Sequence, residues 1–144
     1  MNKLFVIIFL FLSTSIFSQI KTDWLELRDV HYKSQYSEEY DSYFQVPFFG
    51  KNIEALDNKE VTITGYMLTL APDEGVYVLS QNPYADCFFC GYGGPETAIE
   101  LVLKPNHDDF LMDELVTVTG KFKLLYDDVT SGVYRLTDAV AIKE

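Results

Sequence analysis

Two stretches of the chain, residues 61–65 and 116–120, carry nearly the same phrase, Val-Thr-Ile-Thr-Gly and Val-Thr-Val-Thr-Gly. In each, apolar side chains alternate with threonine, and this period of two is that of a β-strand with one buried face. After Gly65, the end of the first phrase, both alternating positions become apolar, which predicts a bulge or a sharp bend at this glycine. We interpret the likeness as the shared geometry of two coiled strands and not as a true repeat.

Five principal strands are expected after residue 60. Turn-forming residues separate them, and a long glycine-rich loop at 81–96 lies between the second strand and the third. This order fits an all-β protein built on a small, strongly coiled, five-stranded antiparallel barrel of the OB-fold kind. A β-sandwich is the alternative. The strands are expected at 61–70, 76–80, 99–103, 116–124 and 133–142, with a short helical turn at 110–112.

The segment 20–58 is the least defined by its sequence. Tyr32, Tyr36, Tyr40 and Tyr43 recur at helical intervals, yet tyrosine favours strands over helices. We therefore expect strand or irregular structure here, with a helix over 34–43 as the alternative. The tyrosine rings are expected to pack against the outside of the barrel, with their hydroxyl groups in water.

The first residues have the layout of a secretory signal peptide: Lys3, an apolar run at 4–12, and small residues up to Ser18. The run of nine apolar residues is well short of the roughly 20 that a membrane-spanning helix needs. We therefore expect a cleaved signal peptide at 1–19 and a single domain at 20–144. The mature protein is expected to be periplasmic or secreted and not an integral membrane protein.

Charge limits the class of partner. The formal net charge of the chain is −11 at pH 7, and an acidic domain is repelled by the phosphate backbone of nucleic acid. We therefore expect no nucleic acid partner, and consider a protein or a glycan instead. The oligomeric state does not follow from the sequence.

Both cysteines of the chain, Cys87 and Cys90, lie in the glycine-rich loop. A gap of two residues lets two thiolates reach one ion, so the first hypothesis is a site for zinc or copper. His107 is the candidate for a further ligand, and for copper the sulfur atoms of Met67 or Met112 are candidates as well. A second cysteine pair from another copy of the chain would also complete four ligands.

Two other interpretations of the cysteine pair stay open. Cys-x-x-Cys is the active motif of thiol–disulfide oxidoreductases, although the βαβ pattern that usually holds it does not occur in this sequence. In an oxidising compartment the pair can instead close into a structural disulfide that rigidifies the loop. The loop would then be a surface for a partner, with Phe88 and Phe89 as apolar anchors and Tyr92 and Glu96 beside them.

The phrases at 55–61, 65–68, 77–80 and 94–96, and above all Cys-Phe-Phe-Cys-Gly at 87–91, carry a resemblance to known proteins. They resemble a family of small exported proteins of Bacteroidetes-type bacteria to which no function is assigned. That family is distantly similar to the periplasmic DUF3299 proteins, which share the Gly-Tyr strand and a cysteine-containing loop. The resemblance covers most of the chain from Trp24 onward and implies an exported OB-like domain, without implying a mechanism.

These observations predict an exported, non-enzymatic binding or accessory module whose Cys87/Cys90 loop binds zinc, copper or a partner. One alternative is a periplasmic thiol–disulfide redox protein. The other is a protein-binding or glycan-binding domain in which the disulfide is purely structural. The chain has two histidines and no Ser-His-Asp signature, so hydrolysis is not expected and no catalytic residue is predicted.

Overall fold

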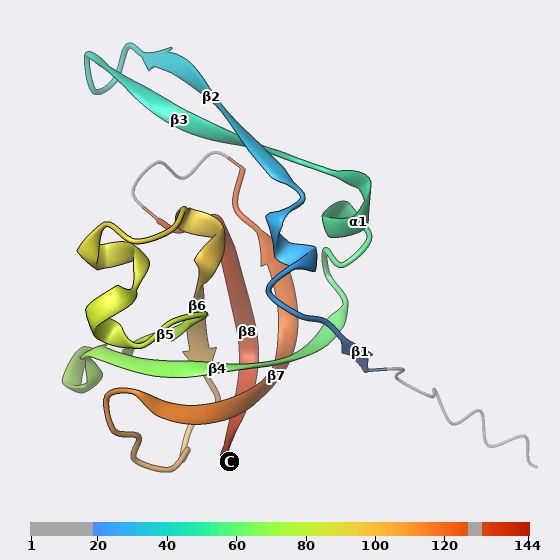
Figure 1. Ribbon diagram of the computed structural model, residues 1–144, viewed down its shortest axis with the longest axis vertical. Coiled ribbons are helices and arrows are strands. Elements are labelled where there is room, and N and C mark those ends of the chain that lie inside the picture. Colours follow the sequence, from blue (N-terminus) through green and yellow to red (C-terminus); the bar gives the residue numbers. More distant parts are fainter. Residues whose placement is uncertain (1–18, 127–130) are drawn as a thin grey trace, which may run out of the picture.

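The predicted barrel is present in the computed structural model, which describes residues 19–126 and 131–144 (Figure 1). Its strands follow the order β4-β5-β6-β8-β7, and β7 pairs with β4 to close the sheet. A closed sheet of five short, coiled strands in this order is an OB-fold barrel, as the sequence predicts. The strands are β4 (Glu60–Ala71), β5 (Val76–Ser80), β6 (Ala98–Leu103), β7 (Glu114–Leu124) and β8 (Tyr134–Lys143).

The barrel differs from the prediction in strand direction. β6 and β8 pair in parallel, so the barrel is mixed and not wholly antiparallel. β7 lies between β6 and β8 in the sequence and runs antiparallel to β8. The chain thus reverses direction at β7, and β8 runs in the same direction as β6. A short strand, β1 (Ile20–Lys21), adds parallel to β4. The helical turn expected at 110–112 is not formed, and that segment is loop and turn.

The two Val-Thr-x-Thr-Gly phrases pair with each other. They run antiparallel in β4 and β7, so that the glycine of each phrase lies opposite the first valine of the other. The threonine hydroxyls are hydrogen bonded across the outer face of this pair, with Oγ1–Oγ1 distances of 2.8 Å (Thr62, Thr119) and 2.5 Å (Thr64, Thr117). The alternate side chains point into the barrel and are buried: Val61, Ile63, Val116 and Val118.

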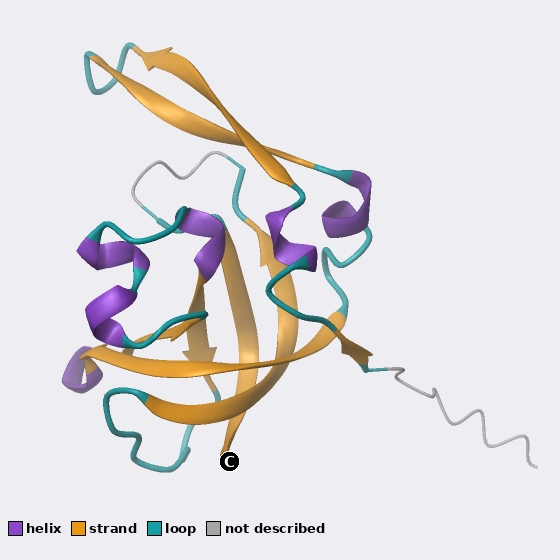
Figure 2. Ribbon diagram, in the orientation of Figure 1, coloured by secondary structure: helices purple, strands orange, loops and turns teal. Residues whose placement is uncertain are grey.

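A two-stranded hairpin stands apart from the barrel (Figure 2). It consists of β2 (Val30–Ser37) and β3 (Ser42–Phe49), which pair with each other along their whole length. The alternative of a helix over 34–43 is therefore wrong. The rings of Tyr36, Tyr40 and Tyr43 do not pack on the barrel as expected. They contact other aromatic rings of the hairpin and are 51%, 49% and 71% exposed. Tyr36 and Tyr43 lie opposite each other, and a cross-strand aromatic pair of this kind stabilises a hairpin.

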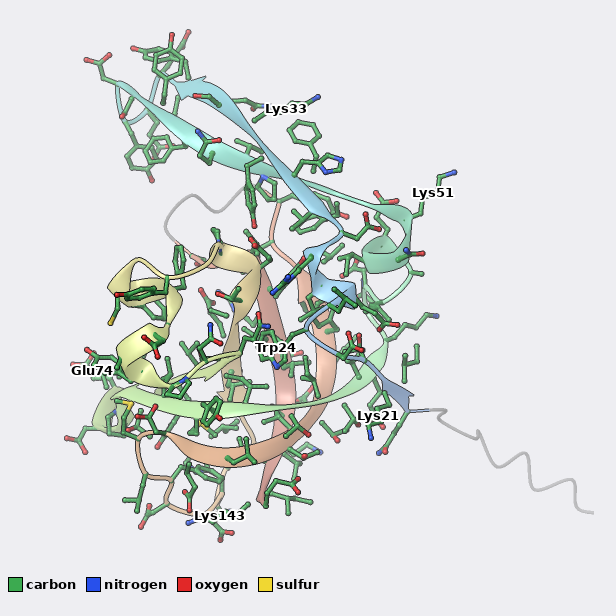
Figure 3. The ribbon with its side chains drawn as sticks, viewed as in Figure 1. Lys21, Trp24, Lys33, Lys51, Glu74 and Lys143 are labelled. Carbon is green, nitrogen blue, oxygen red and sulfur yellow. The ribbon has the colours of Figure 1, made fainter. Side chains whose placement is uncertain are left out.

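The base of the hairpin is fixed to the barrel by the segments before and after it. The 3-10 turn η1 (Glu26–Arg28) buries Leu27, whose carbonyl oxygen accepts a 2.7 Å hydrogen bond from the buried hydroxyl of Tyr134. Trp24, labelled in Figure 3, lies beside β4 and donates a hydrogen bond from Nε1 to the carbonyl oxygen of Thr64 at 2.8 Å. After the hairpin, the short helix α1 (Lys51–Glu54) buries Ile53 in the same core.

The segment predicted to be a signal peptide lies outside the described residues, apart from Gln19. Strand β1 follows directly at Ile20. Among the residues that the structure describes, no helix is long and apolar enough to cross a membrane. Cleavage and export of the chain therefore stay predictions.

A substitution at Gly65 tests the close packing of the barrel at this position. A Cβ atom added there would lie 2.7 Å from the carbonyl oxygen of Ser80 and 2.9 Å from the Trp24 ring. We expect Gly65→Ala to lower the free energy of unfolding by about 1–3 kcal/mol, the usual range for overpacking a core, as measured by urea denaturation.

Gly132→Ala is the matched control. A Cβ atom at Gly132 meets its nearest neighbour, Glu100 Oε1, at 3.4 Å, which is ordinary contact. Because alanine restricts the unfolded chain, this variant should be neutral or more stable by up to about 1 kcal/mol. Equal losses of stability in the two variants would contradict the close approach at Gly65.

Candidate functional site

The cysteine loop is built from three short 3-10 turns between β5 and β6. They are η3 (Tyr84–Asp86), η4 (Phe88–Cys90) and η5 (Pro95–Thr97). Gly91 ends η4 in the left-handed conformation, with φ of 87°, and Gly93 follows with φ of 77°. Residues with a side chain rarely adopt this conformation, so the two glycines let the chain turn back within a few residues.

The two cysteines face each other across η4. Cys87 precedes the turn and Cys90 ends it, and their sulfur atoms are 4.0 Å apart as free thiols. Cys87 is 1% exposed and packs in a small cluster with Leu68, Val78 and Ala98. Cys90 is exposed, and its thiol donates a 3.1 Å hydrogen bond to the carbonyl oxygen of Tyr84. One sulfur is therefore held in the core while the other is accessible.

The electrostatics of the pair do not favour catalysis by Cys90. Desolvation raises the pKa of its thiol, and the hydrogen bond that it shares with Cys87 and the negative charges of Cys87 and Asp86 raise it further. Thiol–disulfide oxidoreductases need the opposite, a thiol whose pKa is lowered by positive charge or a helix N-terminus. This direction disfavours the redox interpretation, which stays a prediction.

The structure does not join His107 to the cysteines. Its ring stacks on Phe110 and contacts Tyr77, and Nδ1 is 2.8 Å from the carbonyl oxygen of Asp108. Two thiolates on one zinc ion lie about 3.8 Å apart, so the spacing of Cys87 and Cys90 suits two ligands. Within 19–126 and 131–144, however, there is no group of three or more His, Cys, Asp or Glu residues that could hold a metal. Metal binding stays a prediction for the cysteine pair.

Glu96 links the cysteine loop to the hairpin. Its Oε2 accepts a 2.9 Å hydrogen bond from the hydroxyl of Tyr32, which lies on β2. Burial and this hydrogen bond raise the pKa of Tyr32 far above its usual value, so the hydroxyl stays protonated and remains a donor. Glu96, expected beside the partner-binding anchors, thus also connects two elements of the fold.

A cleft of about 850 Å³ lies between the hairpin and the barrel. Its floor is formed by β5 and β6, its roof by β2 and β3, and one wall by the cysteine loop, which Figure 1 shows beside the barrel on the hairpin side. Both Phe88 and Phe89 line it, whereas Tyr92, 57% exposed, is not among the described residues that do. Other aromatic side chains in its lining are Tyr32, Tyr36, Phe44, Tyr77 and Tyr126.

One ion pair lies in the lining of this largely apolar cleft. The guanidinium of Arg135 on β8 donates to Oε2 of Glu100 on β6, from Nη2 at 2.6 Å and from Nε at 2.9 Å. The other carboxylate oxygen, Oε1, accepts a 2.6 Å hydrogen bond from the amide of Gly132. Because the two charges neutralise each other, the cleft does not select strongly for a charged ligand.

Sequence reasoning missed the roof of the cleft and this ion pair. The guanidinium of Arg135 is held at the cleft by Glu100, and its side chain is 33% exposed. Glu100 and Arg135 are each a charged residue inside an apolar strand, which is a signal for a pair on neighbouring strands. No such signal exists for Tyr32 and Glu96, which are 64 positions apart.

Comparisons with known proteins support the fold alone. Protein-family models give no match to the chain, and curated proteins give none either. The solved structure of a DUF3299 family protein from Pseudomonas aeruginosa is similar, with a TM-score of 0.55 and 13% sequence identity. The alignment covers 88% of this chain and 98% of the other. The distant similarity to DUF3299 is thereby confirmed in structure, and the resemblance to a Bacteroidetes-type family stays a prediction.

Removing the Tyr32 hydroxyl tests the link between loop and hairpin. Tyr32→Phe deletes the hydrogen bond to Glu96, and we expect a loss of about 1–2 kcal/mol in the free energy of unfolding. Amide hydrogen exchange in β2 and β3 should also become faster. Tyr43→Phe is the control, because that ring is 71% exposed on the same hairpin. Equal behaviour of the two variants would contradict the link.

The accessibility of the two thiols can be measured by alkylation. In the reduced native protein, Cys90 should react first and Cys87 only after unfolding, because Cys87 is 1% exposed. The midpoint of the rate of Cys90 alkylation against pH should lie above the usual thiol value of about 8.5, since the pKa is raised. In Cys90→Ser, alkylation of the folded protein should be absent. A midpoint below 8 would revive the catalytic interpretation.

Proposed function

We propose that the protein is a non-enzymatic binding module that holds an extended segment of a protein partner in the cleft between hairpin and barrel. The observation that carries this proposal is the position of the cleft. Its floor is formed by β5 and β6, the second and third strands of the barrel, and this face is the usual ligand-binding face of the OB-fold. The use of this face by other OB-folds is an analogy, and the apolar, aromatic lining supports the proposal independently.

Binding is favoured over catalysis by the state of the polar groups. The charged groups Glu100 and Arg135 in the lining are engaged with each other. The exposed thiol of Cys90 has a raised pKa, where a nucleophile would need a lowered one. The described residues of the cleft thus provide a contact surface for a ligand, but neither an activated nucleophile nor an unpaired charged group for catalysis.

A polypeptide fits the lining better than a glycan does. Sugars need many polar side chains beside the aromatic rings on which they stack, whereas here Phe44, Phe88, Phe89 and other apolar groups predominate. Phenylalanine and tyrosine are characteristic of protein–protein contacts.

The hairpin offers backbone groups as well. β2 and β3 form a sheet of two strands, so each has one edge that pairs with no other described strand. Four consecutive residues of β3, 44–47, line the cleft. Residues 35–37 of β2 line it as well, and an extended peptide can add as a further strand at the unpaired edge of either strand.

The compartment belongs to the same proposal. The apolar N-terminal run with its small-residue end supports export, and we propose that the module acts in the periplasm or outside the cell. The net charge of −11 favours a partner segment that is neutral or basic over one that is acidic.

Two aromatic residues of one loop allow a matched test. The purified protein is screened on arrays of ten-residue peptides and of glycans, and the affinity for the best peptide is measured by calorimetry. Phe89→Ala should weaken binding by about tenfold, as expected for an interface anchor. Tyr92→Ala, which removes a ring of similar exposure outside the cleft, should leave the affinity unchanged. Binding to glycans alone, or equal effects of the two variants, would refute the proposal.

A further inference from the structure

Cys87 and Cys90 bracket the two phenylalanines that line the cleft. Because the order is Cys-Phe-Phe-Cys, a bond between the two sulfurs would close a loop that contains only Phe88 and Phe89. We propose that Cys87 and Cys90 form a reversible disulfide that sets how tightly the cleft holds its partner. This inference rests on the proposed function, and it assigns to the cysteines a role other than catalysis, metal binding or stability.

The backbone of the loop is already arranged for closure. The amide of Cys90 donates a 3.0 Å hydrogen bond to the carbonyl oxygen of Cys87, and the amide of Tyr92 donates to the same oxygen at 3.2 Å. The sulfur atoms must approach from 4.0 Å to about 2.05 Å. Rotation about the Cβ bonds with a small shift of η4 can supply this movement.

The movement falls on the exposed side of the pair. Cys87 is enclosed by Leu68, Val78 and Ala98, and a close-packed cluster leaves its sulfur little room. Cys90 is exposed, and its thiol is held through one hydrogen bond to the carbonyl of Tyr84. Closure therefore breaks that hydrogen bond and draws Cys90, with the end of η4, toward the core.

The phenylalanines follow this change. Phe88 is half-buried against the cluster that contains Cys87, and Phe89 is 54% exposed. Their rings contact each other at a centroid distance of 5.5 Å. A disulfide restricts the backbone on both sides of the two rings, so less conformational freedom is lost when a partner binds. Preorganisation of this kind increases affinity.

The chemistry is thiol–disulfide exchange with an external disulfide, either a small-molecule disulfide or that of a thiol oxidase. The thiolate of Cys90 attacks one sulfur of the external disulfide, and the other sulfur leaves as a thiolate that takes up a proton. Cys87, after losing its proton, then attacks the Cys90 sulfur and releases the second external thiol. The protein dithiol is oxidised by two electrons, and one external disulfide is reduced to two thiols.

A reversible bond fits this position better than a permanent one. A disulfide that closes a loop of four residues constrains the unfolded chain little, so it adds little to stability. Its Cys90 sulfur stays exposed to external thiols, and exposed disulfides are the ones that exchange readily. The state of the pair therefore follows the thiol and disulfide content of the surroundings.

The experiment measures the affinity of the cleft in the two redox states. The protein is equilibrated in reduced or in oxidised glutathione, and its state is checked by intact mass after alkylation. Binding of the neutral apolar fluorophore N-phenyl-1-naphthylamine is then titrated. We expect the oxidised protein to bind about three to ten times more tightly, the gain from ordering one or two side chains in advance.

Cys90→Ser is the control, because it removes the exposed sulfur, leaves the buried cluster intact and cannot form the bond. Its dissociation constant should be the same in both buffers and equal to that of the reduced protein. Equal or weaker binding by the oxidised protein, or failure of the pair to oxidise, overturns the inference and leaves the proposed function standing. Absence of fluorophore binding in both states also overturns the inference, whereas the proposed function is overturned only if the peptide arrays give no binder.

Discussion

The closure of the barrel depends on the close approach of two backbone segments at Gly65 of β4. β4 pairs with β7 along its first part, up to Met67, and with β5 from Tyr66 onward. This change of partner closes the barrel, and it requires the backbone of Ser80 to approach where a side chain would otherwise lie. Because Ser80 ends β5, the same contact fixes the point from which the cysteine loop leaves the barrel.

The barrel was predictable because each of its strands carries its own signal. Val61 and Ile63 alternate with threonines, and turn residues mark each strand end, so the period of two is visible without tertiary contacts. The parallel pairing of β6 and β8 is not encoded locally, since it follows from the way the sheet closes. The hairpin was ambiguous because Tyr32, Tyr36 and Tyr40 fit a helical period as well as a strand, and pairing with β3 decides between them.

In the candidate site, too, the residues with a local sequence signal were predictable and those brought together by tertiary contacts were not. Phe88 and Phe89 were predicted as the apolar anchors of a partner surface because they are adjacent apolar residues of the cysteine loop, and both line the cleft. The sequence does not show what lies opposite them. The roof comes from the hairpin, and its hydrogen bond from Tyr32 to Glu96 joins residues whose proximity no local pattern predicts. His107 illustrates the reverse: its chemistry suited a metal ligand, but its ring is packed against Tyr77 and Phe110.

The floor and the roof of the cleft differ in how firmly they are held. The floor strands are paired on both sides and backed by the barrel core. The roof is a hairpin of two strands, which is marginally stable by itself, and beyond its base it is joined to the cysteine loop through Tyr32 and Glu96. A covalent change in the barrel would have to deform a packed core. A change in the loop acts on Phe88 and Phe89 directly, and on the roof through Glu96, so the loop is where a small chemical event can alter the shape of the cleft.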